Sequence, residues 1–147
     1  QKIEIRKAEV RDLDTVYGLI CQLEETRFPF EPFEAISLEN IENRDYVYLV
    51  AANGNDDAIG FLSCHGQKLL HHAGLVYEIQ ELYVARNLRG TGIGKALLAS
   101  LEEKLNKTRF EGLEVSANAK RTDAKKFYAK MGFEPTHIKL VKIPVLK

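Results

Sequence analysis

A glycine-rich segment between a strand-like and a helix-like stretch constrains the fold of this chain most. Residues 78–84 (EIQELYV) predict a strand, and residues 89–94 (RGTGIG) follow it closely. Beyond them an apolar residue recurs at every fourth position, which predicts a buried stripe on a helix: Ile93, Leu97, Leu101 and Leu105. Glycines let backbone N–H groups close on an anion, and a helix N-terminus adds partial positive charge. The segment therefore predicts a phosphate-binding loop.

The spacing within this loop separates the known phosphate-binding motifs. A Walker loop needs a glycine five residues before its Gly-Lys pair and a hydroxyl residue after it, whereas Gly94-Lys95 has Arg89 and Ala96 there. The dinucleotide fingerprint fails too, because Lys95 or Leu97 stands where its third small residue belongs. What remains, R-x-x-G-x-G, resembles the pyrophosphate loop of the GCN5-related N-acetyltransferases (GNAT family). The alternative is a glycine-rich turn without a ligand.

This resemblance implies that acetyl-coenzyme A is the acetyl donor. The residues that it assigns to the pyrophosphate are Arg89, Gly90, Thr91, Gly92, Ile93, Gly94 and Lys95. It also implies that backbone N–H groups of the preceding strand hold the thioester carbonyl, around Leu82, Tyr83 and Val84.

Composition limits the classes of partner. The 147 residues suit one domain, residues 1–147, and Lys plus Arg equals Asp plus Glu at 21 each. A zero net charge gives no overall field for nucleic acid or a membrane surface. No apolar stretch is long enough to span a bilayer, and the first residues do not form a signal peptide. Cys21 and Cys64 are expected as free thiols, so we expect a cytoplasmic protein without nucleic-acid or membrane partners.

The pattern of elements predicts an α/β fold (α+β in some schemes). Strands are expected at 3–6, 46–52, 59–65, 76–84, 113–117 and 136–141, with a loop at 67–74. Helices are expected after a cap at Asp12 or Asp14, ended by Pro29 and Pro32, and then at 33–43, 93–105 and 122–131. This order resembles the GNAT fold, which has a mixed, mostly antiparallel central sheet. In that fold helices cover both faces, and splayed central strands hold the coenzyme.

The C-terminal part carries a second local match. Asn118, Tyr128 and the pair Gly132-Phe133 resemble the ending typical of these acetyltransferases. The resemblance places the Tyr128 hydroxyl near the coenzyme sulfur, as the acid for the departing thiolate, and adds Lys126 to the coenzyme-binding residues. A phenol with a pKa of ~10 facing a thiol of ~8.5 predicts a hydrogen bond rather than full proton transfer. Helical spacing equally allows Tyr128 a place on a buried face, and Asn118 is either a turn residue or a pantetheine contact.

The acceptor ammonium must lose a proton, and a buried carboxylate on the central strand is the usual base. Glu78 and Glu81 are the candidates, and their spacing puts them on opposite faces of an ideal strand. Glu78 is the first choice because it stands where Gcn5-type enzymes carry their glutamate. Related enzymes have kinks in this strand, so Glu81 stays open, as does a solvent-facing role for either. The expected mechanism is direct attack in a ternary complex.

Residues outside the coenzyme motif resemble those of the aminoalkylphosphonate N-acetyltransferases. The matching stretches are 70–73 (LHHA), 78–82, Arg89-Gly90, Asn118, Lys120-Arg121, Asp123-Ala124, Phe127-Tyr128 and His137. The resemblance implies a small-molecule primary amine as acceptor, with Lys120 and Arg121, or Arg27, holding a phosphonate. Lys120 and Arg121 alternatively face the 3′-phosphate of coenzyme A or begin a solvated helix. Residues 28–33 depart from this subfamily.

Histidines and acidic residues leave further alternatives open. His71 and His72, with Glu78, either bind a divalent metal or contact the substrate or pack the loop; adjacent residues of an extended segment point to opposite sides. We expect no structural metal, and His65 and His137 as core or pocket-lining residues. Other acceptors are a peptide, or a polyamine or aminoglycoside in an acidic pocket drawn from Glu24, Glu25, Glu31, Glu34 and Glu39. A non-catalytic acetyl-coenzyme A sensor and a homodimer through C-terminal strands also remain.

Overall fold

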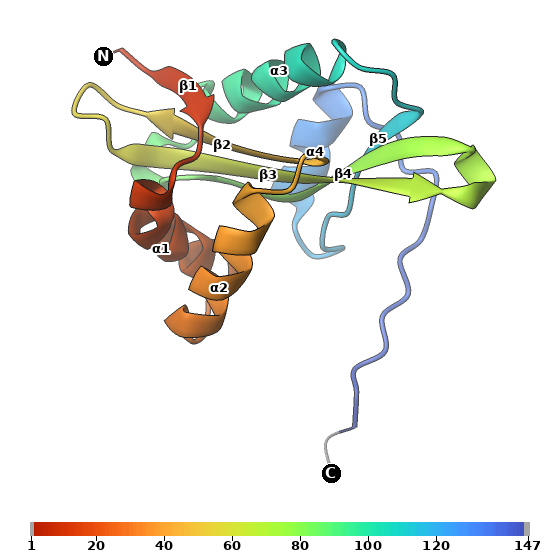
Figure 1. The fold of residues 1–147 in the computed structure, drawn as a ribbon, viewed down its shortest axis with the longest axis horizontal. Coiled ribbons are helices and arrows are strands. Elements are labelled where there is room, and N and C mark those ends of the chain that lie inside the picture. The colour runs from red at the N-terminus through yellow and green to blue at the C-terminus, as the bar shows by residue number, and fades with distance from the viewer. Residues whose placement is uncertain (1, 146–147) are drawn as a thin grey trace. The chain divides into compact units, whose positions relative to one another are not determined.

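The computed structural model describes residues 2–145 and contains one five-stranded sheet within that range (Figure 1). Its strands lie side by side in chain order: β1 (Glu4–Lys7), β2 (Tyr46–Ala52), β3 (Ala58–Leu69), β4 (Gly74–Val84) and β5 (Gly112–Val115). The first four pair antiparallel. The helices are α1 (Leu13–Glu24), α2 (Phe30–Ile41), α3 (Ile93–Leu105) and α4 (Thr122–Lys130). Three short 3-10 turns are η1 (Val10–Asp12), η2 (Leu70–His72) and η3 (Arg86–Leu88).

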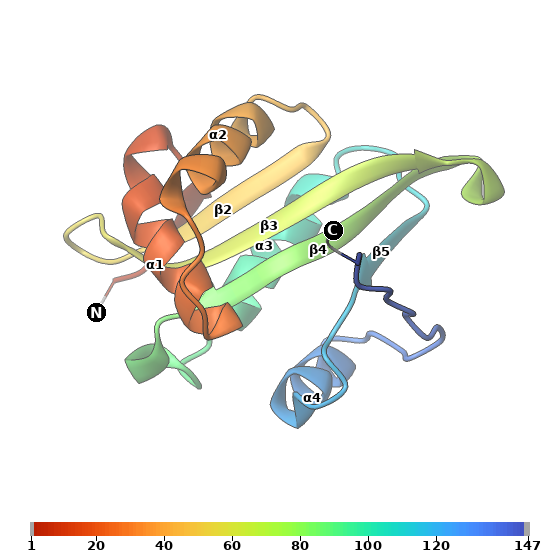
Figure 2. The same cartoon turned by 90° about the horizontal axis from the view of Figure 1, so that it is seen from below.

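The chain forms two compact units, residues 1–114 and residues 115–147. In the first unit α1 and α2 cover one face of the sheet and α3 covers the other, as both views of the ribbon show (Figures 1 and 2). The second unit contains α4 and the residues that follow it. Within residues 2–145 there is no helix long and apolar enough to cross a membrane.

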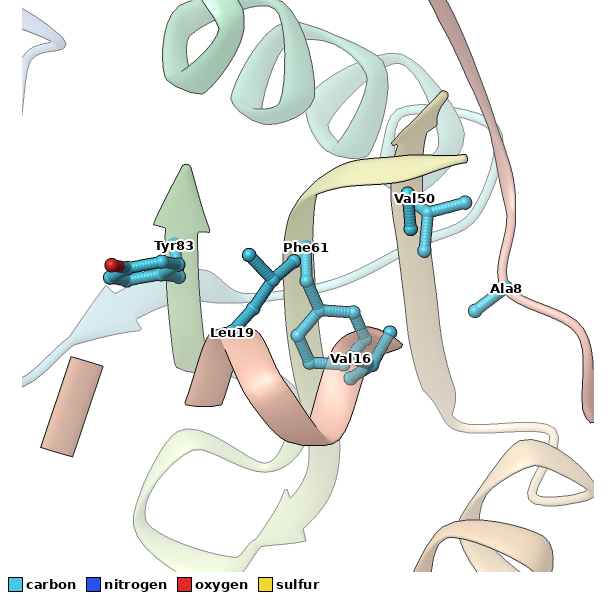
Figure 3. Packing of buried hydrophobic residues seen from close by; sticks show 7 residues of the cluster. Ala8, Val16, Leu19, Val50, Phe61 and Tyr83 are labelled. Carbon is cyan, nitrogen blue, oxygen red and sulfur yellow. The ribbon is translucent and has the colours of Figure 1, made fainter. Parts of the chain in front are cut away.

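Apolar residues on both sides of the sheet form the core of the first unit. Between α1 and the strands, Val16 and Leu19 pack against Phe61 and Val50, with Tyr83 at the edge of the cluster (Figure 3). On the opposite face the predicted stripe of α3 is confirmed, because these side chains are buried: Ile93, Leu97, Leu101 and Leu105. The regular spacing of apolar residues therefore predicts α3 correctly.

The second helix begins earlier than predicted. Pro29 is its N-cap, α2 starts at Phe30, and Pro32 lies inside the first turn rather than before the helix. The first backbone N–H groups of a helix have no intrahelical acceptor, so a proline there removes no hydrogen bond. The expectation that Pro32 separates the helices is therefore wrong.

The predicted loop at residues 67–74 is wrong as well. The ladder between β3 and β4 continues outward through the pairs Gln67↔Val76, Lys68↔Leu75 and Leu69↔Gly74, and η2 closes the hairpin. Ala73, at φ 50°, makes the left-handed turn into β4. Cross-strand backbone hydrogen bonds extend these strands although their polar side chains are exposed and carry no apolar alternation.

In the second unit, the strand predicted at residues 136–141 is not formed. Residues 133–145 carry no helix or strand, and apolar side chains there are exposed, including Ile138 and Leu140. A strand requires a partner for its backbone groups, which alternating apolar residues alone do not supply. His137 is exposed and its Nδ1 lies 2.7 Å from the Thr136 hydroxyl, so it is not a core residue, and a pocket-lining role stays a prediction.

Candidate active site

A β-bulge in β4 brings the two candidate bases to one face of the sheet. Opposite β3, Glu81 pairs with Ser63, Ile79 with Cys64 and Glu78 with His65, so Gln80 is the extra residue. Ser63 and His65 are two residues apart on β3 and therefore share a face of the sheet. Their partners Glu81 and Glu78 share that face too. Simple alternation had predicted opposite faces, and the bulge is the physical reason that this prediction is wrong.

The Glu81 carboxylate is held by the serine opposite it on β3. Its backbone N–H donates to the Ser63 hydroxyl oxygen at 3.0 Å, and that hydroxyl donates back to its carboxylate. Burial raises the pKa of Glu81 above its ordinary value, the Ser63 hydrogen bond opposes that rise, and the charge of Glu24 adds to it. A carboxylate with a raised pKa is better suited to accept a proton near neutral pH.

Next to the glutamates, polar and aromatic side chains from β2, β3 and α2 form a connected row. The Asn40 amide donates to the Tyr48 hydroxyl at 2.8 Å, and that hydroxyl lies 3.2 Å from Nε2 of His65. The ring of Tyr46 stacks on His65 with centroids 3.8 Å apart. Burial lowers the pKa of His65, although Glu78 acts in the opposite direction. His65 is half-buried, as predicted for a core or pocket-lining residue.

At the end of β4, the Tyr83 side chain and the Val84 carbonyl already have partners. Tyr83 is buried in the core, and its hydroxyl donates to Oε1 of Gln22 at 2.7 Å. The Arg89 guanidinium lies 4.8 Å from the centre of the Tyr83 ring, and its Nε donates to the Val84 carbonyl at 3.4 Å. Leu82, Tyr83 and Val84 pair with β3 along one edge of the strand. A role for their N–H groups in holding a carbonyl stays a prediction.

The glycine loop has the backbone that its sequence predicts. Gly90 and Gly92 have φ of 80° and 89°, and Gly92 is the N-cap of α3. A Cβ at either position would have no atom within 4 Å, so conformation rather than crowding requires glycine. The first turn of α3 leaves N–H groups without intrahelical acceptors, and Arg89, Thr91 and Lys95 are exposed beside it. These features fit an anion such as a pyrophosphate.

The two adjacent histidines do not point apart. They belong to the 3-10 turn η2 rather than to an extended segment, and their ring centroids lie 4.4 Å apart. Both are exposed at the tip of the β3–β4 hairpin. The expectation that His71 and His72 face opposite sides is wrong, because the backbone curls there. Among residues 2–145 no group of three His, Cys, Asp or Glu side chains has the arrangement of a metal site.

In the second unit, Asn118 organises the turn before α4. Its side-chain oxygen accepts the Lys120 N–H at 2.9 Å, and its carbonyl accepts the Arg121 N–H at 2.9 Å. Burial raises the pKa of Tyr128 to about 12, and its ring packs edge-on against Phe127 and Phe133. The ammonium groups of Lys120 and Lys126 belong to exposed residues. The turn role of Asn118 is thus observed, and a coenzyme contact stays a prediction.

Two features of the first unit were missed by sequence reasoning. Ser63 has 0% exposure and holds Glu81, and the alternation of Ser63 with His65 on one strand face was the available signal. Tyr46 and Tyr48 contact His65 in this row, and only the register between β2 and β3 brings them there. The acidic residues considered for a polyamine pocket are exposed: Glu24, Glu25, Glu31, Glu34 and Glu39.

Comparisons with known proteins agree with this geometry. A family model described as the acetyltransferase (GNAT) family matches residues 13–133. An aminoalkylphosphonate N-acetyltransferase of Salmonella typhimurium (strain LT2) is 37% identical over 139 residues, covering 95% of this chain and 90% of that protein. Two solved structures each cover 97% of this chain and 99% of their own at 22% identity. They are a transcriptional regulator from Bacillus halodurans C-125 (TM-score 0.85) and glucosamine-6-phosphate N-acetyltransferase from Arabidopsis thaliana (TM-score 0.82). At this identity the two structures confirm the predicted fold alone.

Proposed function

The chain belongs to the acetyltransferase (GNAT) family, and from this premise we propose that it acetylates the primary amine of a small molecule. Aminoalkylphosphonates are the first candidates, because the relative of that name is similar over 95% of this chain. The observation that carries the proposal is the bulge in β4, which puts two carboxylates on one face a few residues before the glycine loop.

Acetyl-coenzyme A is the acetyl donor of this family and supplies a thioester. The residues that would hold its pyrophosphate are Gly90, Gly92 and the first turn of α3, with Arg89 and Lys95 beside them. Their fit rests on the positive φ angles of the glycines and on the N–H groups at the start of α3. The strand just before this loop carries the carboxylates, so one continuous segment would serve both donor and acceptor.

Glu81 is the base in this proposal. The acceptor arrives as an ammonium ion, and its proton passes to the Glu81 carboxylate before the amine nitrogen attacks the acetyl carbonyl carbon. The carbon–sulfur bond then breaks, and the thiolate leaves with the electron pair. The second proton on the nitrogen passes to that thiolate, which gives the neutral amide and the coenzyme thiol. The raised pKa of Glu81 supports this assignment. Glu78, the first choice from sequence, faces the same side and is the alternative that the experiment must compare.

Tyr128 is assigned a hydrogen bond to the departing thiolate. Its pKa, raised by burial to about 12, keeps the phenol protonated in the neutral range and makes it a weak acid. A hydrogen bond to developing negative charge is therefore its expected contribution, rather than full proton transfer.

The acceptor's anionic end needs cationic partners. Lys120 and Arg121 precede α4 in the second unit, and Arg27 follows α1 in the first. The Arg27 guanidinium carbon lies 5.9 Å from the centre of the Tyr17 ring, in an open surface hollow that aromatic side chains and Asp14 line. A guanidinium binds phosphonate oxygens through paired N–H donors, so each of these residues is a candidate contact.

The test measures initial rates of coenzyme A thiol release from acetyl-coenzyme A. Acceptors are 2-aminoethylphosphonate and 1-aminoethylphosphonate, set against spermidine, kanamycin and a short peptide, each with and without added divalent metal. Glu81→Gln and Glu78→Gln are assayed in parallel. We expect turnover of the phosphonates and the larger loss in Glu81→Gln.

Each other outcome changes a different part of the proposal. Turnover of another amine alone would keep the family activity and reject the phosphonate. A larger loss in Glu78→Gln would exchange the two carboxylates. Acetyl-coenzyme A binding without turnover of any acceptor would favour a non-catalytic sensor.

A further inference from the structure

We propose that Ser63 is a positioning residue for the reaction: it holds one oxygen of the Glu81 carboxylate and leaves the other to accept the proton. This inference rests on the proposed function, in which Glu81 is the base. Ser63 need not touch the acceptor or the coenzyme for this role, because it acts through Glu81.

The contact between the two side chains closes a ring of hydrogen bonds. The Glu81 backbone N–H donates to Ser63 Oγ at 3.0 Å, and the Ser63 hydroxyl donates to Oε1 of Glu81. An ionised carboxylate can only accept, so the hydroxyl gives it its single proton while a lone pair of Oγ accepts the amide. The serine therefore recognises both the backbone and the side chain of the same residue.

Burial makes this arrangement rigid. Ser63 is 0% exposed on β3, and Glu81 lies directly opposite it on β4. A glutamate has three side-chain torsions, so an unrestrained Glu81 would lose its orientation. The bulge at Gln80 brings Glu81 onto the Ser63 face, and the hydrogen-bonded ring then selects one arrangement of its carboxylate.

The same contact controls when Glu81 is ionised. Burial and the charge of Glu24 favour the neutral acid, whereas the Ser63 hydroxyl favours the carboxylate. Other titratable groups on this face come from three strands: Tyr46 and Tyr48 from β2, His65 from β3, and Glu78 and Tyr83 from β4. Without the serine donor, the pKa of Glu81 rises further, and a base must be deprotonated to work.

The test is the pH dependence of kcat/KM in Ser63→Ala, using the acceptor that the wild type turns over best. The acidic limb of the profile should move to higher pH by about one unit, because a hydrogen bond to a charged group is worth roughly that much. In the plateau above this limb, kcat should fall about tenfold as Glu81 loses its orientation. Ser63→Cys keeps a weaker donor of similar size and should give a smaller shift.

Ser37→Ala is the matched control, because Ser37 on α2 is also a buried serine, with 6% exposure. It should leave the position of the acidic limb unchanged. If Ser63→Ala does not fold, Ser63→Cys decides alone: a limb that stays at the wild-type pH together with wild-type kcat overturns the proposal. A uniform loss of activity in Ser63→Ala without any shift in the limb also overturns it.

Glu81→Gln separates this inference from the proposed function. If that variant is nearly inactive while Ser63→Ala keeps the wild-type profile, Glu81 is the base and Ser63 does not position it. If Glu81→Gln retains the wild-type rate and profile, the assignment of Glu81 fails, and the Ser63 inference fails with it.

Discussion

The substitution Asp12→Asn should destabilise the first unit more than any exposed carboxylate would. Asp12 is 4% exposed, and it accepts hydrogen bonds from both terminal nitrogens of Arg6 at 2.8 and 2.9 Å. It also accepts the Glu9 backbone N–H at 2.8 Å, which fixes the entry into α1. Arg6 in turn donates to Asp56 at 3.1 Å, so this group of charges joins β1 to the β2–β3 turn.

The expected loss of stability follows from the burial of the ion pair and from the partner that Arg6 keeps in the variant. Removing one partner of a buried ion pair costs about 3 to 5 kcal/mol, because the other charge is left uncompensated. Arg6 is 14% exposed and retains Asp56, so part of that penalty is relieved. We therefore expect a loss of about 2 to 3 kcal/mol in the free energy of unfolding.

The pH dependence of this loss identifies its cause. Burial alone would raise the pKa of Asp12, but the hydrogen bonds from Arg6 and Glu9 outweigh it and hold the pKa below its ordinary value. A depressed pKa stabilises the fold above the unfolded-state pKa of about 3.9, and this contribution is lost as the pH falls through the lower, native value. The difference between wild type and Asp12→Asn should therefore be constant near neutral pH and shrink below about pH 4.

Urea unfolding followed by far-ultraviolet circular dichroism measures this difference across pH. Asp57→Asn, at an exposed position of the β2–β3 turn, is the matched control and should change stability by less than about 0.5 kcal/mol. A loss below about 1 kcal/mol for Asp12→Asn at neutral pH, or a loss that persists undiminished in acid, would refute the reasoning.

Three further predictions concern two glycines and the tyrosine proposed to donate a hydrogen bond to the departing thiolate. Gly92→Ala should raise the KM for acetyl-coenzyme A about five- to tenfold, because a φ of 89° costs a residue with a Cβ about 1 to 2 kcal/mol. The control Gly54→Ala should leave this KM unchanged, and initial rates measure both variants. Gly60→Ala should lower the free energy of unfolding by about 1 to 2 kcal/mol, because its Cβ would lie 3.2 Å from two side-chain atoms of α3. Gly18→Ala, at an exposed position of α1, should raise it by about 0.5 to 1 kcal/mol in the same urea assay. Tyr128→Phe should lower kcat about tenfold with little change in KM; an unchanged kcat would contradict the role of the phenol.

Regular periodicity made much of the first unit predictable from sequence. The bounds of β2 and α3 follow from apolar spacing, and the glycine loop follows from two residues that the backbone requires at positive φ. The start of α2 was missed because a proline in a first helical turn looks like a helix breaker in sequence. The outer β3–β4 hairpin was missed because backbone pairing, which no side-chain pattern records, holds it together.

The arrangement of Glu78 and Glu81 was not predictable for a related reason. Alternation assigns faces only while the ladder is regular, and a single unpaired residue, Gln80, reverses the assignment for every position beyond it. The role of Ser63 depends on that same register, because the serine faces Glu81 only when the bulge is present. A register shift of one residue thus decides which carboxylate lies opposite Ser63.

In the proposed function, the chemical step and recognition of the acceptor's anionic group depend on different parts of this chain. The proposed base, the end of β4 and the anion loop all lie between Glu78 and Gly94, so a strand rise of about 3.3 Å per residue fixes the spacing of Glu81 from the strand end. A segment this short can be recognised from its amino-acid sequence. The candidate partners of a phosphonate, in contrast, follow α1 at Arg27 or precede α4 at Lys120 and Arg121, in segments far apart in sequence. Acceptor identity therefore depends on tertiary placement, and substitution of these cations should change KM for the acceptor while leaving KM for acetyl-coenzyme A unchanged.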